Sequence, residues 1–275
     1  MLLFSTFGIC NAQNSNEKIF TKQDTILYHQ IMEKLATFQN AGKNQVMVLV
    51  AKELLGTPYV AGTLETIPET LSVYLHQTDC ILFVESCLAM TTLLCSDEMK
   101  NGIPPFSRYC EVIQSMRYRN GVVDGYTSRI HYTSEWILQN EKNGLLEEYT
   151  SKYGERKYQT FSFMSTHPQS YEQLKNSPAE VKKIKETEKN LDLQTKVYTI
   201  AAADIPKNEK HIQDGDIICF VSKVKGLDIT HVGIAHRENG RLTFIHASLK
   251  YKKVVIEPKS LSEYCTTSIR TVRLK

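Results

Sequence analysis

The sequence Thr78-Asp79-Cys80-Ile81-Leu82-Phe83-Val84-Glu85-Ser86-Cys87-Leu88-Ala89-Met90-Thr91-Thr92-Leu93-Leu94 predicts a helix that begins at a cysteine. Thr78 or Asp79 can cap this helix by accepting a hydrogen bond from a free backbone N–H group. Six residues at helical spacing form one largely apolar stripe, which we expect to pack on a core: Cys80, Phe83, Val84, Cys87, Leu88 and Thr91. The stretch therefore places Cys80 in the first turn of a core-packed helix.

The position of Cys80 suits a nucleophile. The partial positive charge at a helix N-terminus stabilises an anion, so we expect a lowered pKa for the Cys80 thiol. The alternative is that Cys80 is a small buried hydrophobe, which is the usual role of a free cysteine. Six cysteines follow Cys10 without any CxxC pair: Cys80, Cys87, Cys95, Cys110, Cys219 and Cys265. This scatter argues against a zinc ribbon and against a dense disulfide framework.

Length and composition indicate an ordinary soluble chain. It has 275 residues, of which 41% are hydrophobic and 23% charged, enough for one large or two small domains. The net charge of +3 is too small to indicate binding to nucleic acid, and we expect no nucleic-acid partner. Beyond the N-terminus, no stretch approaches the roughly 18 apolar residues that span a bilayer, so no transmembrane segment is expected.

Residues 1–13, Met-Leu-Leu-Phe-Ser-Thr-Phe-Gly-Ile-Cys-Asn-Ala-Gln, resemble the end of a secretory signal. An apolar run is followed by small and polar residues, which favours cleavage near Ala12 or Gln13. Cys10 raises the alternative of a lipoprotein, but Phe7-Gly8-Ile9-Cys10 is a poor lipobox. We therefore expect export to the periplasm or cell envelope.

The rest of the chain, residues 14–275, is expected to form a single α+β domain in three parts. A helical part covers 17–100, a central insertion covers about 101–200, and a strand part covers 212–275. Apolar periodicity predicts helices at 17–38, 44–55, 134–140 and 168–190. Short runs between turn residues predict strands at 216–222, 230–236, 241–248, 252–257 and 268–274. Consecutive short strands predict an antiparallel sheet or a small barrel.

Two histidines lie on neighbouring predicted strands. His231 begins one strand and His246 lies near the end of the next, so antiparallel pairing can bring them side by side. With Cys80 they fit an arrangement of nucleophile, base and orienting group. One alternative is that both are structural histidines. Another is a zinc site of Cys80, His231 and His246, which the absence of ligand-pair spacing argues against.

Several motifs carry a resemblance to known families. Four occur in the order found in the NlpC/P60 papain-like cell-wall hydrolases: Leu55-Gly56-Thr57-Pro58-Tyr59 before Asp79-Cys80, Gly215-Asp216-Ile217-Ile218-Cys219-Phe220, His231-Val232-Gly233-Ile234, and Ile245-His246-Ala247-Ser248. Three longer forms resemble one branch, the DUF1460 group of N-acetylmuramoyl-L-alanine amidase-like proteins: Gly56-Thr57-Pro58-Tyr59-Val60-Ala61-Gly62-Thr63-Leu64-Glu65, Ser128-Arg129-Ile130-His131-Tyr132, and Gly226-Leu227-Asp228-Ile229-Thr230-His231. The resemblance extends over about residues 45–275 and implies a papain-like fold.

The resemblance also implies roles for individual residues. Cys80 matches the nucleophile, His231 the general base and His246 the orienting residue, while Tyr59 matches a tyrosine whose hydroxyl lies near the thiol. Ile81 departs from the family pattern, which has a small or hydroxyl residue after the cysteine. No metal or other cofactor is implied.

The cluster Ser128-Arg129-Ile130-His131-Tyr132 is predicted to bind substrate. Arg129 offers a planar fork that suits a carboxylate, and Ser128, His131 and Tyr132 can add hydrogen bonds or stacking. The alternative is a surface loop held by an ion pair. We interpret Asp79 as a plain helix cap and Asp228 as a turn residue.

Together these features predict a cysteine amidase that acts on peptidoglycan fragments, with a muropeptide as its partner. The DUF1460 resemblance points to the N-acetylmuramoyl-L-alanine bond. One alternative is an endopeptidase that cuts between D-glutamate and the diamino acid. A second is a cell-envelope binding protein without catalysis, although the chain retains the cysteine and both histidines.

Overall fold

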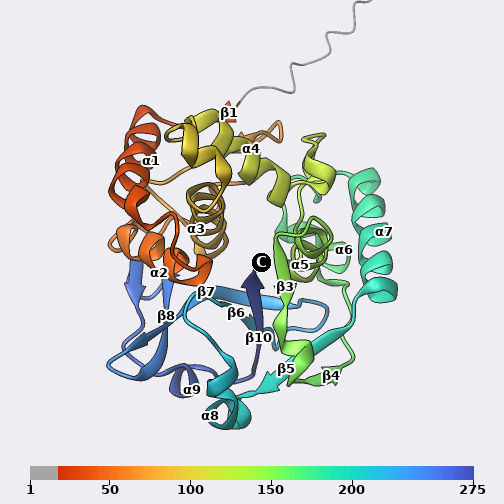
Figure 1. Cartoon of the computed structure of the whole chain (residues 1–275). Coiled ribbons are helices and arrows are strands. Elements are labelled where there is room, and N and C mark those ends of the chain that lie inside the picture. The colour runs from red at the N-terminus through yellow and green to blue at the C-terminus, as the bar shows by residue number, and fades with distance from the viewer. Residues whose placement is uncertain (1–17) are drawn as a thin grey trace, which may run out of the picture.

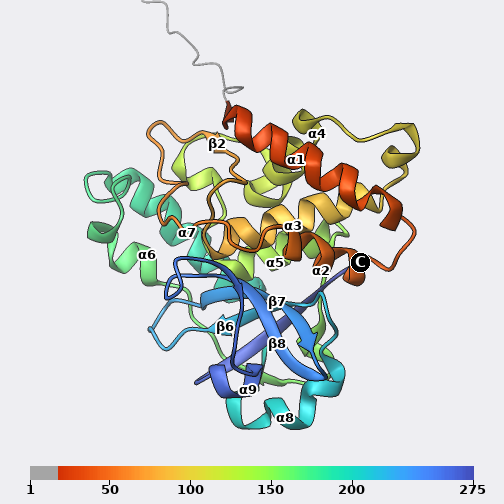
Figure 2. The same ribbon diagram turned by 90° about the vertical axis from the view of Figure 1, so that its left-hand side faces the viewer.

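Helices gather on one side of an antiparallel sheet in residues 18–275, which are the residues that the computed structural model describes (Figures 1 and 2). The predicted signal segment at 1–13 lies outside this range. Two short helices, α8 (Ile205–Asn208) and α9 (Leu261–Tyr264), lie at the opposite end of the sheet in both views. The sequence-based prediction of an α+β fold is therefore confirmed.

The helical layer contains the predicted helices and two more. The bounds are α1 (Lys22–Leu35), α2 (Lys43–Glu53), α3 (Cys80–Leu94), α4 (Phe106–Arg117), α5 (Thr133–Lys142), α6 (Phe163–Thr166) and α7 (Pro178–Gln194). The helix predicted at 168–190 begins later, because Ser177 caps α7 and Pro178 occupies its first position. No helix in the described part of the chain is long and apolar enough to cross a bilayer.

The helix α3 is buried on nearly every side, so the prediction of a single apolar stripe was wrong. Its side chains from Leu82 to Leu94 are buried except at Thr92. The reason is that α1, α2 and α4 pack against it from one direction while two sheet strands, β7 (Ile229–Glu238) and β8 (Arg241–Ser248), pack from the other. A helix in this position is apolar all round rather than amphipathic.

The sheet has eight strands and stays open. Its order is β4-β5-β10-β6-β7-β8-β9, and β3 also pairs with β10, all antiparallel. The five predicted strands are present as β6 (Ile217–Val221), β7, β8, β9 (Lys253–Ile256) and β10 (Ser268–Leu274). Because β4 and β9 remain edges, the alternative of a small barrel was wrong for the described residues.

The insertion supplies three strands that the sequence did not reveal. They are β3 (Leu146–Glu148), β4 (Glu155–Lys157) and β5 (Val197–Ala201). The first two have only three residues each and are rich in charge, so they carry no alternating pattern. They are strands because β10 and β5 offer free backbone groups to pair with. A separate parallel pair, β1 (Lys18–Ile19) with β2 (Leu71–Ser72), joins the start of the described chain to the loop before α3.

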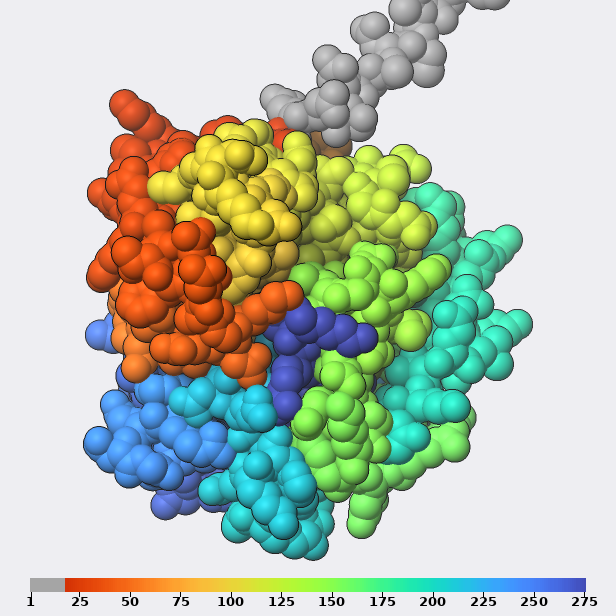
Figure 3. Space-filling view, viewed as in Figure 1, coloured from red at the N-terminus to blue at the C-terminus, as the bar shows by residue number. Residues whose placement is uncertain are grey.

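A carboxylate from the strand part caps the helix α5. Neither Thr133 nor Ser134 caps it with its side chain, contrary to the prediction. Instead the buried Asp228 accepts a 2.6 Å hydrogen bond from the Ser134 backbone N–H. The interpretation of Asp228 as a turn residue was therefore incomplete, because it ties the insertion to the strand part. On the face shown in Figure 3, the C-terminal residues lie between the N-terminal helices and the insertion. The Lys43 ammonium at the start of α2 donates a hydrogen bond to the Lys275 carbonyl.

Close packing between β7 and β8 leads to a stability prediction. A Cβ at Gly233 would lie 2.7 Å from Phe244 Cδ2 and 3.2 Å from His246 Cβ. Gly233→Ala should therefore lower the free energy of unfolding by about 1–3 kcal/mol. Urea denaturation followed by circular dichroism measures this. Gly42→Ala, where an added Cβ meets nothing within 4 Å, is the control for steric contact; since Gly42 is the N-cap of α2, its change should be about 0.5–1 kcal/mol. Equal stabilities for the two variants would contradict the packing argument.

Candidate active site

Cys80 is the first residue of α3, and the loop before it is held firmly. The Asp79 carboxylate caps α3 by accepting a 2.9 Å hydrogen bond from the Leu82 N–H. The buried Asp24 on α1 accepts hydrogen bonds from the Leu75 and His76 backbone N–H groups at 2.6 and 3.1 Å. These bonds hold the loop before α3 in place. Cys80, the candidate nucleophile, is partly exposed at the end of this loop.

The two predicted histidines meet on neighbouring strands. His231 lies on β7 and His246 on β8, and the His231 Nε2 and His246 Nδ1 atoms are 2.6 Å apart. The Phe220 ring of β6 stacks beside His231 with centroids 5.8 Å apart. Because Nε2 of His231 is engaged with His246, Nδ1 is the nitrogen left to accept a proton.

The start of α3 packs against β7 close to His231. The backbone N–H of Val232, the residue after His231, lies near the Cys80 sulfur and acts to lower the pKa of the thiol, against the larger effect of burial. The Tyr59 ring is close by: the charges of Cys80 and Asp79 help to raise the pKa of its phenol, after burial. Tyr59 also pairs with Thr78 through a parallel bridge. The structure therefore brings Tyr59, Cys80 and the two histidines together.

The electrostatics at Cys80 differ from the expectation. Burial, followed by the negative charge of Asp79, raises the pKa of the Cys80 thiol to about 12, although backbone N–H groups oppose this. Burial, followed by the charge of His246, lowers the pKa of His231 to about 3, and burial lowers the pKa of His246 to about 4. The resting site at neutral pH thus holds a thiol and neutral imidazoles. The prediction of a lowered Cys80 pKa was wrong because desolvation outweighs the helix N-terminus.

A cavity of about 260 Å³ lies beside Cys80, between α3 and the insertion. Ile81 and Glu85 of α3 form one wall. The remaining lining residues come from the loop before α3, from α4, from the rest of the insertion and from the turn before β7: Leu64, Glu65, Arg117, Tyr126, Arg129, Ile130, His131, Tyr132, Thr133, Trp136, Met164, Tyr171 and Leu227. A second cavity of about 290 Å³ lies on the sheet side and includes His231, Lys223 and Tyr264. His231 thus lines the second cavity, whereas Cys80 and His246 line neither, and Ile81 is the residue that connects the start of α3 to the first cavity.

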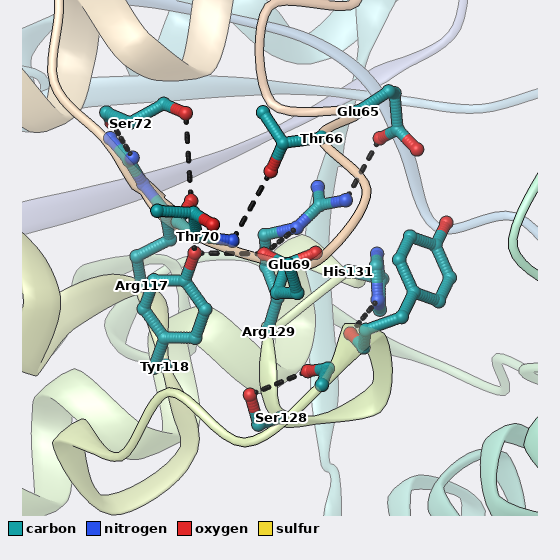
Figure 4. Close-up of polar contacts among 12 residues, drawn as sticks. Glu65, Thr66, Glu69, Thr70, Ser72, Arg117, Tyr118, Ser128, Arg129 and His131 are labelled. Carbon is teal, nitrogen blue, oxygen red and sulfur yellow. Dashed lines mark hydrogen bonds and ion pairs between the residues drawn. The ribbon is translucent and has the colours of Figure 1, made fainter. Parts of the chain in front are cut away.

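Arg129 lines the first cavity, but its guanidinium already holds carboxylates of the chain. Figure 4 shows it between Glu65 and Glu69, each 2.9 Å away. The Tyr118 hydroxyl donates to the same Glu69 oxygen at 2.8 Å. The alternative of a surface loop held by an ion pair is therefore correct in part. Arg129 does form ion pairs within the chain, but it is buried rather than at the surface.

The other residues of the predicted binding cluster also have partners within the chain. His131 contacts the Tyr126 carbonyl at 3.0 Å, and burial, followed by the charge of Arg129, holds its pKa well below the usual range. The Tyr132 hydroxyl donates to Glu188 at 2.7 Å. The Ser128 hydroxyl donates to the Gly125 carbonyl and closes a turn, and Ser128 does not line the cavity.

Sequence reasoning missed the buried ion pair beneath the cavity. Glu85 and Arg117 lie 2.8 Å apart, and both side chains are at most 3% exposed. One signal was available in the sequence, because Glu85 is the only charged residue in the apolar stretch that forms α3. Its partner on α4 could not be identified without the tertiary structure. Within residues 18–275, no three His, Cys, Asp or Glu side chains are grouped as metal ligands.

Comparison with known proteins gives consistent matches over most of the chain. The AmiA-like family, described as N-acetylmuramoyl-L-alanine amidase-like, matches residues 49–271. An N-acetylmuramoyl-L-alanine amidase from Bacteroides uniformis ATCC 8492 is 37% identical, with a TM-score of 0.79 over 85% of this chain and 100% of that chain. A Bacteroides fragilis protein described as a candidate xylanase is also 37% identical, with a TM-score of 0.75 over 81% of this chain and 98% of that chain.

A more distant structure shares the fold. Protein LPG0564 from Legionella pneumophila, assigned to DUF1460, is 21% identical, with a TM-score of 0.64 over 90% of this chain and 94% of that chain. Comparison with curated proteins gives no match.

The charge of Asp79 leads to a prediction about thiol reactivity. Asp79→Asn keeps a side chain that can cap α3 but removes the negative charge beside Cys80. The pKa of Cys80 should fall, and its alkylation by iodoacetamide should begin at lower pH than in the wild type, where it should still be rising above about pH 9. Mass spectrometry of the Cys80 peptide against pH measures this, with the Cys95 peptide as an internal control. Identical Cys80 curves in both proteins would exclude an effect of Asp79.

Proposed function

This chain belongs to the AmiA-like family of N-acetylmuramoyl-L-alanine amidase-like proteins, and we propose that it is a cysteine amidase that cleaves the N-acetylmuramoyl-L-alanine bond in peptidoglycan fragments. The observation that carries the proposal is the position of Cys80 at the start of a buried helix, beside the contact between His231 and His246. The papain-like NlpC/P60 relationship is part of the same proposal. So is a location in the periplasm or cell envelope, where peptidoglycan is found.

The proposed reaction begins with a proton transfer. The Cys80 thiol gives its proton to Nδ1 of His231 as the sulfur attacks the amide carbonyl. His246 accepts the hydrogen bond from His231 Nε2 and stabilises the imidazolium that forms. Because the resting thiol is neutral, this transfer coincides with attack rather than preceding it.

The remaining steps release the two products. The backbone N–H of Cys80 and the Tyr59 hydroxyl are the donors that we assign to the developing oxyanion. The His231 imidazolium then protonates the leaving amine of the peptide, and the acyl group stays on sulfur as a thioester. Water hydrolyses the thioester, with His231 as the base, and regenerates the thiol.

We assign substrate binding to the cavity beside Cys80. Arg129, His131 and Tyr132 line this cavity, and Ser128 holds the turn before Arg129. Tyr59 lies outside the lining, near Cys80, and we assign it to the part of the substrate next to the thiol. Of the two carboxylates on Arg129, Glu69 is buried with 1% of its side chain exposed, whereas Glu65 is 40% exposed. We therefore infer that a carboxylate of the stem peptide replaces Glu65 and leaves the pair with Glu69 intact.

The nucleophile assignment leads to the first functional prediction. Cys80→Ala should lower kcat on a muropeptide by at least about 10³-fold, because no other group there can form the thioester. Cys87→Ala, at a buried position about two turns further along the same helix, should retain activity and is the matched control. Mass spectrometry of the products identifies the bond that is cut. Turnover by Cys80→Ala with a normal circular dichroism spectrum would refute the cysteine mechanism, and products cut after D-glutamate would refute the bond assignment.

The exchange at Arg129 leads to a second functional prediction. Glu65→Ala removes the exposed competitor for the guanidinium, so KM for a muropeptide with free stem carboxylates should fall while kcat changes little. With the same muropeptide amidated at those carboxylates, KM should not fall. Arg129→Ala is a poorer test, because it leaves the buried Glu69 with the Tyr118 hydroxyl but without a cationic partner, and breaking a buried ion pair in this way costs about 3–5 kcal/mol. If Glu65→Ala has the same effect on both substrates, Arg129 has a structural role only.

A further inference from the structure

A buried carboxylate lies behind the histidine pair. Glu257 directly follows β9 and is 4% exposed. Its Oε2 atom lies 3.3 Å from Nε2 of His246, on the side of the ring opposite His231. Among residues 18–275, His246 is the only basic side chain within ion-pair distance of Glu257. His231, His246 and Glu257 therefore form one line of contacts, which leads from the strand beside Cys80 into the interior.

Glu257 is costly to bury for a purely structural purpose. Removing a carboxylate from water costs several kcal/mol, and a neutral imidazole at 3.3 Å offsets only part of this cost. Its Oε1 accepts only a 3.2 Å hydrogen bond from the Lys259 backbone N–H. His246 Nε2 has no aligned hydrogen bond to any described residue, so the two buried groups are each other's available partners.

Which ring nitrogen of His246 carries the proton decides whether His231 can act as a base. If His246 carries its proton on Nε2, facing Glu257, its Nδ1 is an acceptor and His231 must donate from Nε2. His231 Nδ1 is then free to take the thiol proton. In the opposite arrangement His246 donates from Nδ1 and His231 carries its proton on Nδ1, which cannot accept one. A carboxylate beside His246 Nε2 favours the first arrangement.

We propose that Glu257 is a positioning residue for the proposed amidase reaction. It fixes the tautomer of His246, and through it that of His231, and its negative charge stabilises the imidazolium formed during attack. No proton leaves the imidazole pair for Glu257 in this scheme, because His231 exchanges protons only with the Cys80 sulfur, the leaving amine and the attacking water. The effect of Glu257 on the rate rests on the proposed function, whereas its effect on the histidine tautomers does not depend on that function.

The surroundings allow the effect of Glu257 to be separated from other charges. Besides Glu257, the titratable groups around the pair are Cys80 at the start of α3, and Lys223 and Tyr264, which share a cavity with His231. The Phe244 ring lies 4.6 Å from His246 and the Tyr264 ring 5.8 Å, both between centroids, which excludes water from one side of His246. Glu257 is thus the one carboxylate that adjoins the buried end of the line in the described chain.

The test compares Glu257→Gln, which keeps an acceptor but loses the charge, with Glu257→Ala, which loses both. The kcat on a muropeptide should fall about 10-fold in the first and about 10²-fold or more in the second, with KM nearly unchanged. The acid limb of the kcat/KM profile should move to lower pH in Glu257→Gln, because the imidazole pair is harder to protonate without the charge. Glu263→Gln, at an exposed position on α9, is the matched control.

A second measurement does not depend on turnover. Nitrogen-15 NMR of labelled histidines should show His246 protonated on Nε2 in the wild type and a changed tautomer in Glu257→Ala. If the wild type fails to cleave any muropeptide, the proposed function falls while this measurement still decides the role of Glu257. Unchanged tautomers, or kcat and pH profiles equal to those of Glu263→Gln in both variants, would overturn the proposal. Glu257→Gln is nearly isosteric, so it answers the question even if Glu257→Ala does not fold.

Discussion

The packing of α3 onto β7 and β8 is the interaction on which the rest of the structure depends. It buries an apolar helix between other helices and the sheet, and it brings the first residue of that helix against the strand that carries His231. Because α3 is buried on nearly every side, it cannot rotate or slide without opening the core. The nucleophile candidate is therefore held by the hydrophobic core, and the polar groups around it need only adjust its chemistry.

Buried charges then join the insertion to this framework. Asp228 in the strand part caps α5, Glu85 on α3 pairs with Arg117 on α4, and Arg129 holds two carboxylates from the loop before α3. Such pairs add little net stability, since desolvation offsets much of their attraction. Their directional bonds instead determine how the insertion sits over Cys80, and so they define the shape of the cavity beside it.

The same burial sets the protonation states of the site. Desolvation favours the neutral form of both an acid and a base, so the Cys80 thiol and the two imidazoles are all neutral at rest. In the proposed reaction, charge appears only when a proton moves from the Cys80 sulfur to His231. A fixed negative charge at Glu257, on the far side of His246, suits this arrangement because it acts on the imidazolium without lying beside the sulfur.

The sequence by itself determined the helix at Cys80, the five C-terminal strands and the closeness of His231 to His246. Helical and strand periodicity are local properties, and antiparallel pairing of consecutive strands follows from short turns. Only the tertiary structure decided the partners of Arg129, the cap from Asp228, the strands β3, β4 and β5, and the direction of the Cys80 pKa shift. Each of these depends on groups far apart in the chain, whose distance and exclusion from water arise only when the core has packed.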